Sequence, residues 1–324
     1  LHDMQKAIEL NDNRGVYRSR LLLDSDSAAR SASLGRIYND LGFQQRGLLE
    51  GWNSVNQDPS NYSAHRLLAD NYAVLPRHEV SRLSELLKAQ LLQPVNITPV
   101  QPQAAENNIL ILDGLGSNIT SFNEYNPLFT RNRFALQASG FYGSRDTISD
   151  EVVHSGVWDK FSYSLGQFHY QTDGFRENNQ QKKDAYNVFA QAEVIKDINI
   201  QVELRRSEEK YGDINQDFFT NKFSSKRNGS IENDSVRGGL HHKFSENSDL
   251  LLSIVHKAKL LNAFDDSQGL DINTSRKTIG TQYELQHLFS HEYFDLTTGM
   301  NYLINQSSQE QVLLGIPDPS TGNP

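Results

Sequence analysis

The sequence predicts an α + β protein with more than one domain: a helical part, residues 1–93, precedes an antiparallel β part, residues 131–324. Three observations lead to this prediction. Before residue 93, apolar residues recur every three or four positions, as on one face of a helix. After residue 131 they alternate with polar residues, as in a strand with one apolar face. The segment between them, 94–130, contains Pro94, Pro99 and Pro102, which interrupt both structures, so it is predicted to be a linker.

Composition excludes several classes of function. The 324 residues carry a net charge of -9 and no cysteine, so disulfides and thiolate metal sites are absent. No concentrated basic face is visible, which argues against a nucleic-acid partner. No apolar run approaches the roughly 18 residues of a membrane helix. The mean hydropathy of -0.60 is still compatible with a membrane barrel, whose strands alternate between polar and apolar residues.

The first ten residues, LHDMQKAIEL, already read like the interior of a helix. No basic start and apolar core of a signal peptide precede them. We therefore expect this chain to be an internal fragment of a longer protein, in which case a missing targeting signal says nothing about location.

Two segments of the helical part repeat a pattern with an offset of 34 residues. Leu34, Gly35, Tyr38 and Leu41 are matched by Leu68, Ala69, Tyr72 and Leu75. Together with Gly42, Gly47 and Pro59, this pattern resembles the tetratricopeptide repeat (TPR) family over about residues 28–93. The resemblance implies paired helices in which small residues allow close approach and Leu and Tyr fill the space between pairs. The implied packing residues are Leu34, Gly35, Tyr38, Gly42, Gly47, Pro59, Leu68, Ala69 and Tyr72.

The first helix of each TPR pair lines a concave groove. By the resemblance, Arg36, Asn39, Arg66 and Asp70 would face this groove and bind a partner protein. The alternative is that these residues form ordinary solvated helix surface.

Nine runs of alternating polarity follow the linker and predict nine strands. They cover residues 131–143, 150–157, 161–172, 185–195, 198–209, 235–244, 249–261, 276–289 and 294–306. Short breaks, as at 196–197 and 291–293, alternate with long polar loops, as at 210–234. A change of phase between Leu165 and Phe168 predicts a bulge.

Short turns at one end and long loops at the other are typical of a transmembrane β-barrel. The β part resembles outer-membrane barrels of the porin and TonB-dependent-receptor kind. Aromatic residues expected beside the short turns would form an interfacial girdle; they are Tyr186, Trp158, Phe161, Phe244, Phe289, Tyr293 and Phe294. The polar residues expected to line the barrel lumen are Gln191, Glu193, Gln201, Glu203, Arg205, Gln282, Glu284 and Gln286. Nine strands would be an incomplete barrel, because bacterial barrels normally have an even number.

Motifs of catalysis are absent: the sequence contains no G-x-S-x-G, H-E-x-x-H or P-loop pattern, so we expect no enzyme activity and no cofactor. His241 and His242 are adjacent and would point to opposite faces of a strand. Asp213, Asn215 and Asp217 begin like a calcium loop, but the turn glycine and the final glutamate are missing. No metal site is predicted.

The arrangement of TPR repeats before an outer-membrane barrel is similar to that of exopolysaccharide export porins. It implies an outer-membrane protein with its repeats in the periplasm, which transports or exports a solute or polymer and binds a partner protein through the TPR segment. Two alternatives remain open. The barrel would only anchor a TPR scaffold, or the chain would be a soluble β-rich binding protein whose apolar faces are covered by protein.

Overall fold

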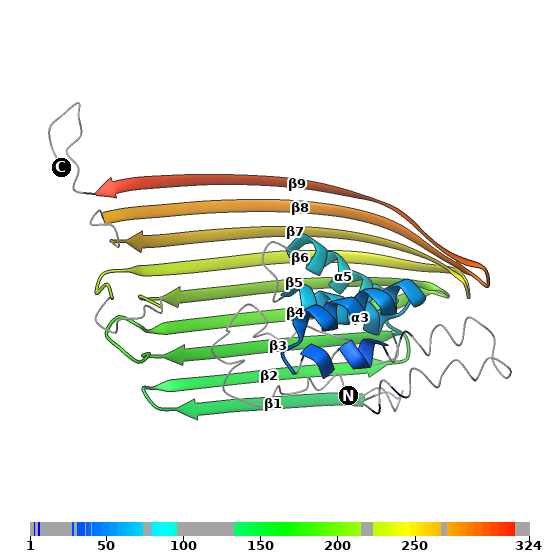
Figure 1. Cartoon of the computed structure of the whole chain (residues 1–324), viewed down its shortest axis with the longest axis horizontal. Coiled ribbons are helices and arrows are strands. Elements are labelled where there is room, and N and C mark those ends of the chain that lie inside the picture. The colour runs from blue at the N-terminus through cyan, green and yellow to red at the C-terminus, as the bar shows by residue number, and fades with distance from the viewer. Residues whose placement is uncertain are drawn as a thin grey trace.

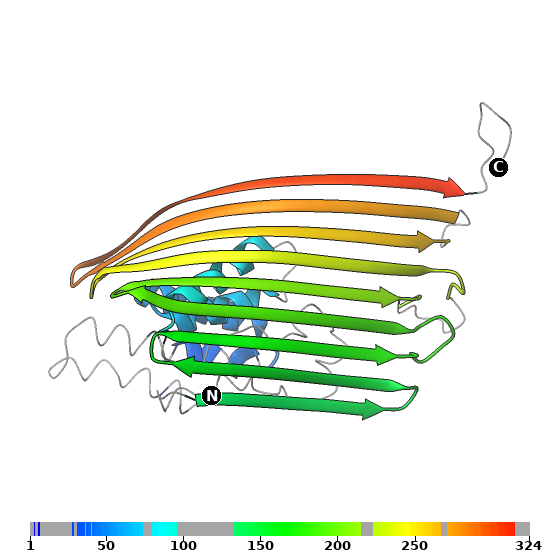
Figure 2. The same cartoon turned by 180° about the vertical axis from the view of Figure 1, so that it is seen from behind.

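The structure, a computed structural model, describes residues 3, 6, 28, 31–35, 37–39, 41–73, 79–95, 133–214, 223–266 and 271–314. Its main feature is one antiparallel sheet in which the spatial order of the strands, β1 to β9, is their order along the chain (Figure 1). The three helices that the structure bounds lie on one side of this sheet, and none of them lies on the other side (Figure 2). The linker predicted at 94–130 lies outside the described residues, apart from its first two positions.

The helices are α3 (Gln44–Gln57), α4 (Tyr62–Ala73) and α5 (Glu79–Leu92). A further helical segment covers residues 31–35 and 37–39. Gly42, at φ 81°, ends this segment because glycine adopts the left-handed conformation without steric cost. The side chain of Asn61 caps the start of α4 by accepting from the backbone N–H groups of Ser63 and Ala64 at 3.0 and 3.2 Å. No helix among the described residues has the length and apolar composition needed to cross a bilayer.

The strands are longer than the sequence pattern predicts. They span β1 Arg133–Gly143, β2 Thr147–Trp158, β3 Phe161–Thr172, β4 Gln181–Ile195, β5 Ile198–Tyr211, β6 Asn228–Ser245, β7 Ser248–Asp265, β8 Asp271–His291 and β9 Phe294–Leu314. Within the described residues they number nine, as predicted, and each overlaps one of the predicted runs. The added residues lie beside the long loops: β5 runs on to Tyr211 and β6 already begins at Asn228, which shortens the expected 25-residue loop at both ends. In these added parts of the strands most residues on both faces are polar. The alternation of apolar and polar residues used to predict strands therefore does not detect them.

The register between strands is continuous except beside two short turns. Shifts occur between Glu193 and Ile195 and between Lys243 and Ser245. The bulge predicted near Phe168 was wrong, because β3 pairs without a shift with both neighbours. Phe168 and Tyr170 simply point to the face opposite Leu165, where each is only 3% exposed.

The burial of side chains on the two faces of the sheet is the inverse of that in a soluble protein: polar side chains are buried and apolar ones are exposed. In β5, Gln201 and Glu203 are buried while the intervening Val202 and its neighbour Leu204 are exposed by 47% and 49%. The same alternation holds in β4, where Gln191 is buried and Val188 is exposed. We call the polar, helix-bearing side the inner face and the apolar side the outer face. The outer face is exposed over several strands, and soluble monomers rarely expose an apolar area of this extent.

The apolar residues of the outer face form a band beside the short turns. Along β5 this face carries Ile198, Ile200, Val202 and Leu204, and then changes to Arg206, Glu208 and Lys210. Along β9 the apolar stretch runs from Phe294 to Ile304 and the polar stretch starts at Gln306. This stretch has the length of about 9–11 residues that a tilted strand needs to cross a bilayer.

Aromatic rings cluster on the outer face at the short-turn edge of the band. The Trp158 ring lies 4.6 Å from that of Phe134 and 5.7 Å from that of Tyr163, measured between centroids. At other turns Phe244 contacts His242, and Phe294 contacts Phe289. The prediction for Tyr186 was wrong, because this residue pairs with Arg206 at the far edge of the band.

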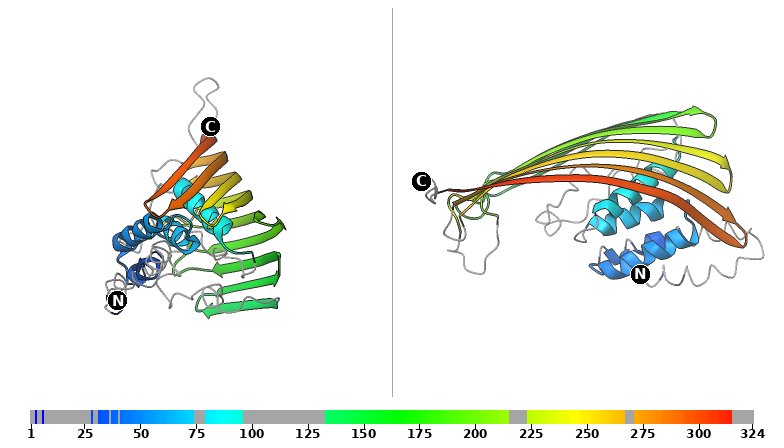
Figure 3. Two further views of the ribbon diagram at one scale, coloured as in Figure 1. Left: turned by 90° about the vertical axis from the view of Figure 1, so that its right-hand side faces the viewer. Right: turned by 90° about the horizontal axis from the view of Figure 1, so that it is seen from above.

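The sheet curves around the helices, which occupy its concave, inner face near the short-turn end (Figure 3). α5 contacts β5, β6 and β7, and α4 lies between α3 and α5. Within the described residues the sheet is open, since β1 and β9 each pair with one neighbour only. The sequence predicted a barrel, and the described residues form a curved sheet that does not close.

Candidate functional site

The inner face carries a buried polar cluster centred on Glu203 of β5. Its carboxylate accepts a hydrogen bond from Asn187 Nδ2 at 2.7 Å and pairs with the guanidinium of Arg237. From the helical side, Gln90 Nε2 of α5 donates to the second carboxylate oxygen at 3.2 Å. Glu203 and Arg237 are only 2% and 3% exposed. Because removing one member of a buried ion pair leaves an uncompensated charge, about 3–5 kcal/mol depends on this pairing.

Two further polar contacts attach α5 to the sheet. Gln93 Nε2, just beyond the helix end, donates to Gln191 Oε1 at 3.1 Å. Ser84 Oγ, near the helix start, donates to Glu284 Oε1 at 2.8 Å. Lys88 Nζ lies 4.0 Å from the same Glu284 oxygen. The contacts extend from Ser84 to Gln93, which fixes the direction of the helix across the strands.

A small apolar cluster lies among these polar contacts. Leu91 of α5 packs with Leu251 of β7 and Leu288 of β8, and Leu92 borders the cluster. Gly239 of β6 makes room for the helix, because a Cβ atom at this position would lie 2.7 Å from Leu91 Cδ2. Where α5 contacts it, the inner face is therefore complementary to the helix in shape as well as in polarity.

An ion-pair group joins α4 to α5. His65 Nδ1 lies 2.5 Å from Glu85 Oε2, and its Nε2 donates to the Pro59 carbonyl oxygen at 2.8 Å. Lys88 Nζ donates to Glu85 Oε1 at 2.8 Å. Burial raises the pKa of Glu85, but the hydrogen bond and charge of His65, followed by those of Lys88, outweigh it and lower this pKa to about 2. Glu85 therefore stays ionised and holds the two helices together.

The residues predicted to line the lumen all lie on the inner face. Four of them, Gln191, Gln201, Glu203 and Gln282, are buried. Glu284 contacts α5, Arg205 and Gln286 are partly buried, and Glu193 pairs with Lys160 at 3.3 Å beside a short turn. From the sequence we expected these residues to line a water-filled lumen. At the centre of the sheet this expectation was wrong, because α5 covers the inner face there.

Most residues predicted to pack the helices lie at helix contacts; Gly42 does not, because a Cβ atom there would have no neighbour within 4 Å. Leu34, Leu68 and Ala69 are buried, and a Cβ atom on Gly35 would lie 2.6 Å from Leu67 Cδ2. Gly47 packs against Asn39 and Asn71 in the same way. Tyr38 stacks edge-on against Phe43, Tyr72 accepts from Trp52 Nε1 at 2.9 Å, and Pro59 contacts His65. These contacts agree with a helical repeat, whereas membership of the TPR family stays a prediction.

The predicted groove residues are only partly placed. Arg36 lies outside the described residues. Arg66 Nε and Asp70 Oδ1 form an ion pair at 2.9 Å along α4. Asn39 packs on Gly47, between helices. Partner binding by these four residues remains a prediction.

Sequence reasoning missed the residues that join the helices to the sheet: Ser84, Gln90, Gln93, Asn187 and Arg237. One signal was available for α5. Gln90 and Gln93, three residues apart on one side of the helix, interrupt a sequence otherwise rich in Leu. Amides on the buried side of a helix indicate a polar partner surface. Their partners, more than 90 residues away, could not be read from the sequence.

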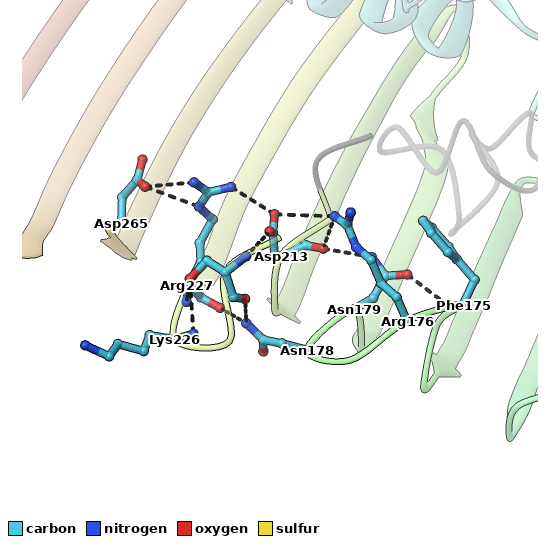
Figure 4. A network of polar contacts seen from close by, with 9 residues as sticks. Phe175, Arg176, Asn178, Asn179, Asp213, Lys226, Arg227 and Asp265 are labelled. Carbon is cyan, nitrogen blue, oxygen red and sulfur yellow. Dashed lines mark hydrogen bonds and ion pairs between the residues drawn. The ribbon is translucent and has the colours of Figure 1, made fainter. Parts of the chain in front are cut away.

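At the opposite end of the strands, a polar network centred on Asp213 ties two long loops together (Figure 4). Asp213 is fully buried, and its carboxylate accepts from Arg227 Nη1 at 2.9 Å and from the Ser224 backbone N–H at 2.7 Å. Arg227 also donates to Asp265 Oδ1 at 3.0 Å. From the β3–β4 loop, Asn179 Nδ2 donates to the Asp213 carbonyl oxygen at 2.8 Å. Asp213 thus acts as an anchor for loop structure.

Metal-ligating groups are not assembled in the described part of the chain: no three His, Asp or Glu side chains there converge on one point. Asn215 and Asp217 of the calcium-like pattern lie outside the described residues. His241 and His242 point to opposite faces, as expected. His241 Nε2 contacts Asp249 Oδ1 at 2.7 Å on the inner face, while the His242 ring lies 4.2 Å from that of Phe244 on the outer face.

Comparisons with known proteins gave only partial overlaps. No family model matches the sequence, and no curated protein matches it. Among solved structures, the sheet overlaps with the copper transporter OprC (TM-score 0.48, 12% identity), the siderophore receptor PiuA from Acinetobacter baumannii (0.44, 10%) and P. aeruginosa FpvA bound to heterologous pyoverdines (0.44, 12%). Each overlap covers 56% of this chain but only 29%, 31% and 28% of those chains. At such scores the overlap assigns neither a fold nor a function.

Proposed function

We propose that this chain is part of an outer-membrane β-barrel protein that transports or exports a solute or polymer, with a TPR-like helical segment that occupies the inner face of the wall. The observation that carries the proposal is the inverted burial of the sheet. Apolar side chains of the band are exposed, while Glu203, Arg237 and Gln191 are buried on the other side. In water this arrangement is unfavourable, whereas lipid outside and a polar interior inside stabilise it.

The position of the band supports an orientation. The band borders the short turns and the charged outer-face residues border the long loops, as in barrels whose short turns face the periplasm. In this orientation the strands extend beyond the membrane on the outside. The helices then lie inside the wall, toward its periplasmic end, and a partner protein would reach them from that side.

The proposal is tested on the complete protein. We expect it to be extracted from membranes by detergent only, to be absent from the soluble fraction, and to give ion conductance in planar bilayers. Recovery of folded protein in the soluble fraction would contradict the membrane placement and favour the soluble β-rich alternative.

A second function, a membrane-anchored scaffold without transport, is favoured by one observation. α5 covers the polar face through buried contacts with Glu203 and Gln191, so a path along this face is obstructed. A membrane-inserted protein that gives no conductance and binds a periplasmic protein through its helices would support the scaffold and contradict transport.

A further inference from the structure

A cavity of about 700 Å³ lies where strands β3 to β8 approach the long loops. One row of directly paired residues crosses its floor: Gln171, Lys182, Lys210, Ser230 and Asn262. These positions have the same parity as Tyr186 and Leu204, so the row lies on the outer face of the sheet. It lies six residues beyond Leu204, or roughly 20 Å along the strand above the apolar band.

The row contains an unfavourable pair. Lys182 and Lys210 are direct partners on neighbouring strands, and like charges in this position destabilise a sheet. The acidic residues of the next row on this face contact basic side chains. Asp184 contacts His169 Nδ1 at 2.6 Å, and Glu208 and Glu232 contact Arg206 at 2.7 and 4.0 Å. The nearest carboxylate to Lys182 is Asp184, at 3.7 Å. Lys182 thus shares the Asp184 carboxylate with His169, and it lines the same cavity as Lys210, so an anionic ligand there would meet two ammonium groups.

The rest of the lining can recognise hydroxyl groups. Asn228, Asn262 and Asn273 contribute side-chain amides, which both donate and accept hydrogen bonds. Phe264 contributes an aromatic ring beside them. Asp173 also lines the cavity, and its carboxylate can accept hydrogen bonds from hydroxyl groups. Amides, an aromatic surface, one carboxylate and two ammonium groups together match a sugar that carries hydroxyl groups and a carboxylate or phosphate group.

The rim of the cavity is held in place by the loop network. Gly212 N donates to the Gln180 carbonyl oxygen at 2.9 Å, next to Asp213. Asn178 Nδ2 donates to the carbonyl oxygens of Ser224 and Arg227 at 2.7 and 2.8 Å. Gln180, whose carbonyl oxygen accepts one of these bonds, and Asn228, which directly follows Arg227, both line the cavity, so the loop contacts hold part of its rim.

We propose that this cavity binds an acidic saccharide, either the sugar part of an outer-leaflet glycolipid or a soluble acidic polysaccharide. The site does not depend on transport through the barrel. Only the glycolipid source depends on the proposed membrane placement, since it requires the cavity to lie at the height of lipid-linked sugars.

The experiment measures binding by calorimetry to the complete protein in detergent. One probe is a tetramer of galacturonic acid, with the neutral galactose tetramer as its control. The other is a phosphorylated glycolipid in mixed micelles, with the dephosphorylated lipid as its control. We expect at least one acidic probe to bind at least tenfold more tightly than its neutral counterpart. Binding of the tetramer identifies a soluble polysaccharide, and binding of the glycolipid alone identifies the lipid source.

Variants connect the binding to the row. The double substitution Lys182→Gln and Lys210→Gln should weaken binding of the acidic probe at least tenfold. Lys277→Gln removes a lysine from the same face outside the cavity and should leave binding unchanged. Lys182→Glu places opposite charges across the strands, so it should keep the thermal midpoint and still abolish binding. Failure of both acidic probes to bind, or equal binding by the double variant, would overturn the proposal, whereas membrane extraction would be unaffected.

Discussion

Neighbouring residues of one strand meet opposite environments in this protein. Glu203 is buried with three hydrogen-bonding partners, while Val202, next to it, is exposed to the outside. A buried carboxylate without partners would cost several kcal/mol, so Asn187, Arg237 and Gln90 make its burial possible. The inner face is thus specific for a polar partner, and α5 supplies one.

The Glu85 carboxylate gives the helical segment a defined dependence on pH. Its pKa is about 2 in the folded protein, against an ordinary value of 4.5. A lowered pKa stabilises the folded state above pH 4.5, and this contribution, of the order of 3 kcal/mol, is lost as the pH falls from 4.5 towards 2. We expect the thermal midpoint of the helical signal to fall steeply over this interval in circular dichroism.

The control for this prediction is Glu85→Gln, which keeps the shape of the side chain but cannot ionise. Its thermal midpoint should be lower at pH 6 and should change less between pH 4.5 and 2. An equally steep decrease in the variant would show that another group is responsible.

At the scale of elements, α5 attaches to the sheet by side chains alone. Its contacts are amide and hydroxyl hydrogen bonds to Gln191, Glu203 and Glu284, together with one small leucine cluster. No backbone ladder joins helix to sheet, so the helix can detach while the strands keep their pairing. Local openings of this kind need far less free energy than global unfolding.

Adjacent glycines of β6 allow this attachment to be tested. Gly239 faces α5, where a Cβ atom would overlap Leu91, whereas a Cβ atom on Gly238 would have no neighbour within 4 Å. We expect Gly239→Val to raise the amide exchange rate of α5 at least tenfold and to increase conductance in planar bilayers. Gly238→Val changes the same strand on the outer face and should do neither. Equal effects of the two substitutions would contradict the docking described here.

The sequence predicted the elements better than their assembly. Strict alternation, as from Phe294 to Ile304, identified all nine strands because one face of each is apolar. Strand ends such as 228–234 were missed, since Ser230, Glu232 and Asp234 are polar on a face that is apolar elsewhere. The position of the helices could not be predicted, because it depends on pairings such as Gln93 with Gln191, which leave no local pattern.

At the scale of the whole molecule, the apolar band is the feature on which the proposed membrane placement rests. Met300 lies within the band and is 68% exposed. Met300→Lys would put a charge into lipid, which costs about 2–4 kcal/mol near the middle of a bilayer. We expect this variant to give at least tenfold less folded protein in the membrane fraction. Gln306→Lys, on the same face of the same strand but beyond the band, should insert normally, and an equal loss in both would argue against a membrane at this height.

The strict sequential order of the strands has a consequence for assembly. Every strand pairs only with the strands that precede and follow it in the chain. Each hairpin is thus a unit that can form from nearby residues, without waiting for a distant segment to be synthesised. Because all the described pairings join strands that are consecutive in the chain, removing one whole hairpin would leave the register of the remaining pairs unchanged.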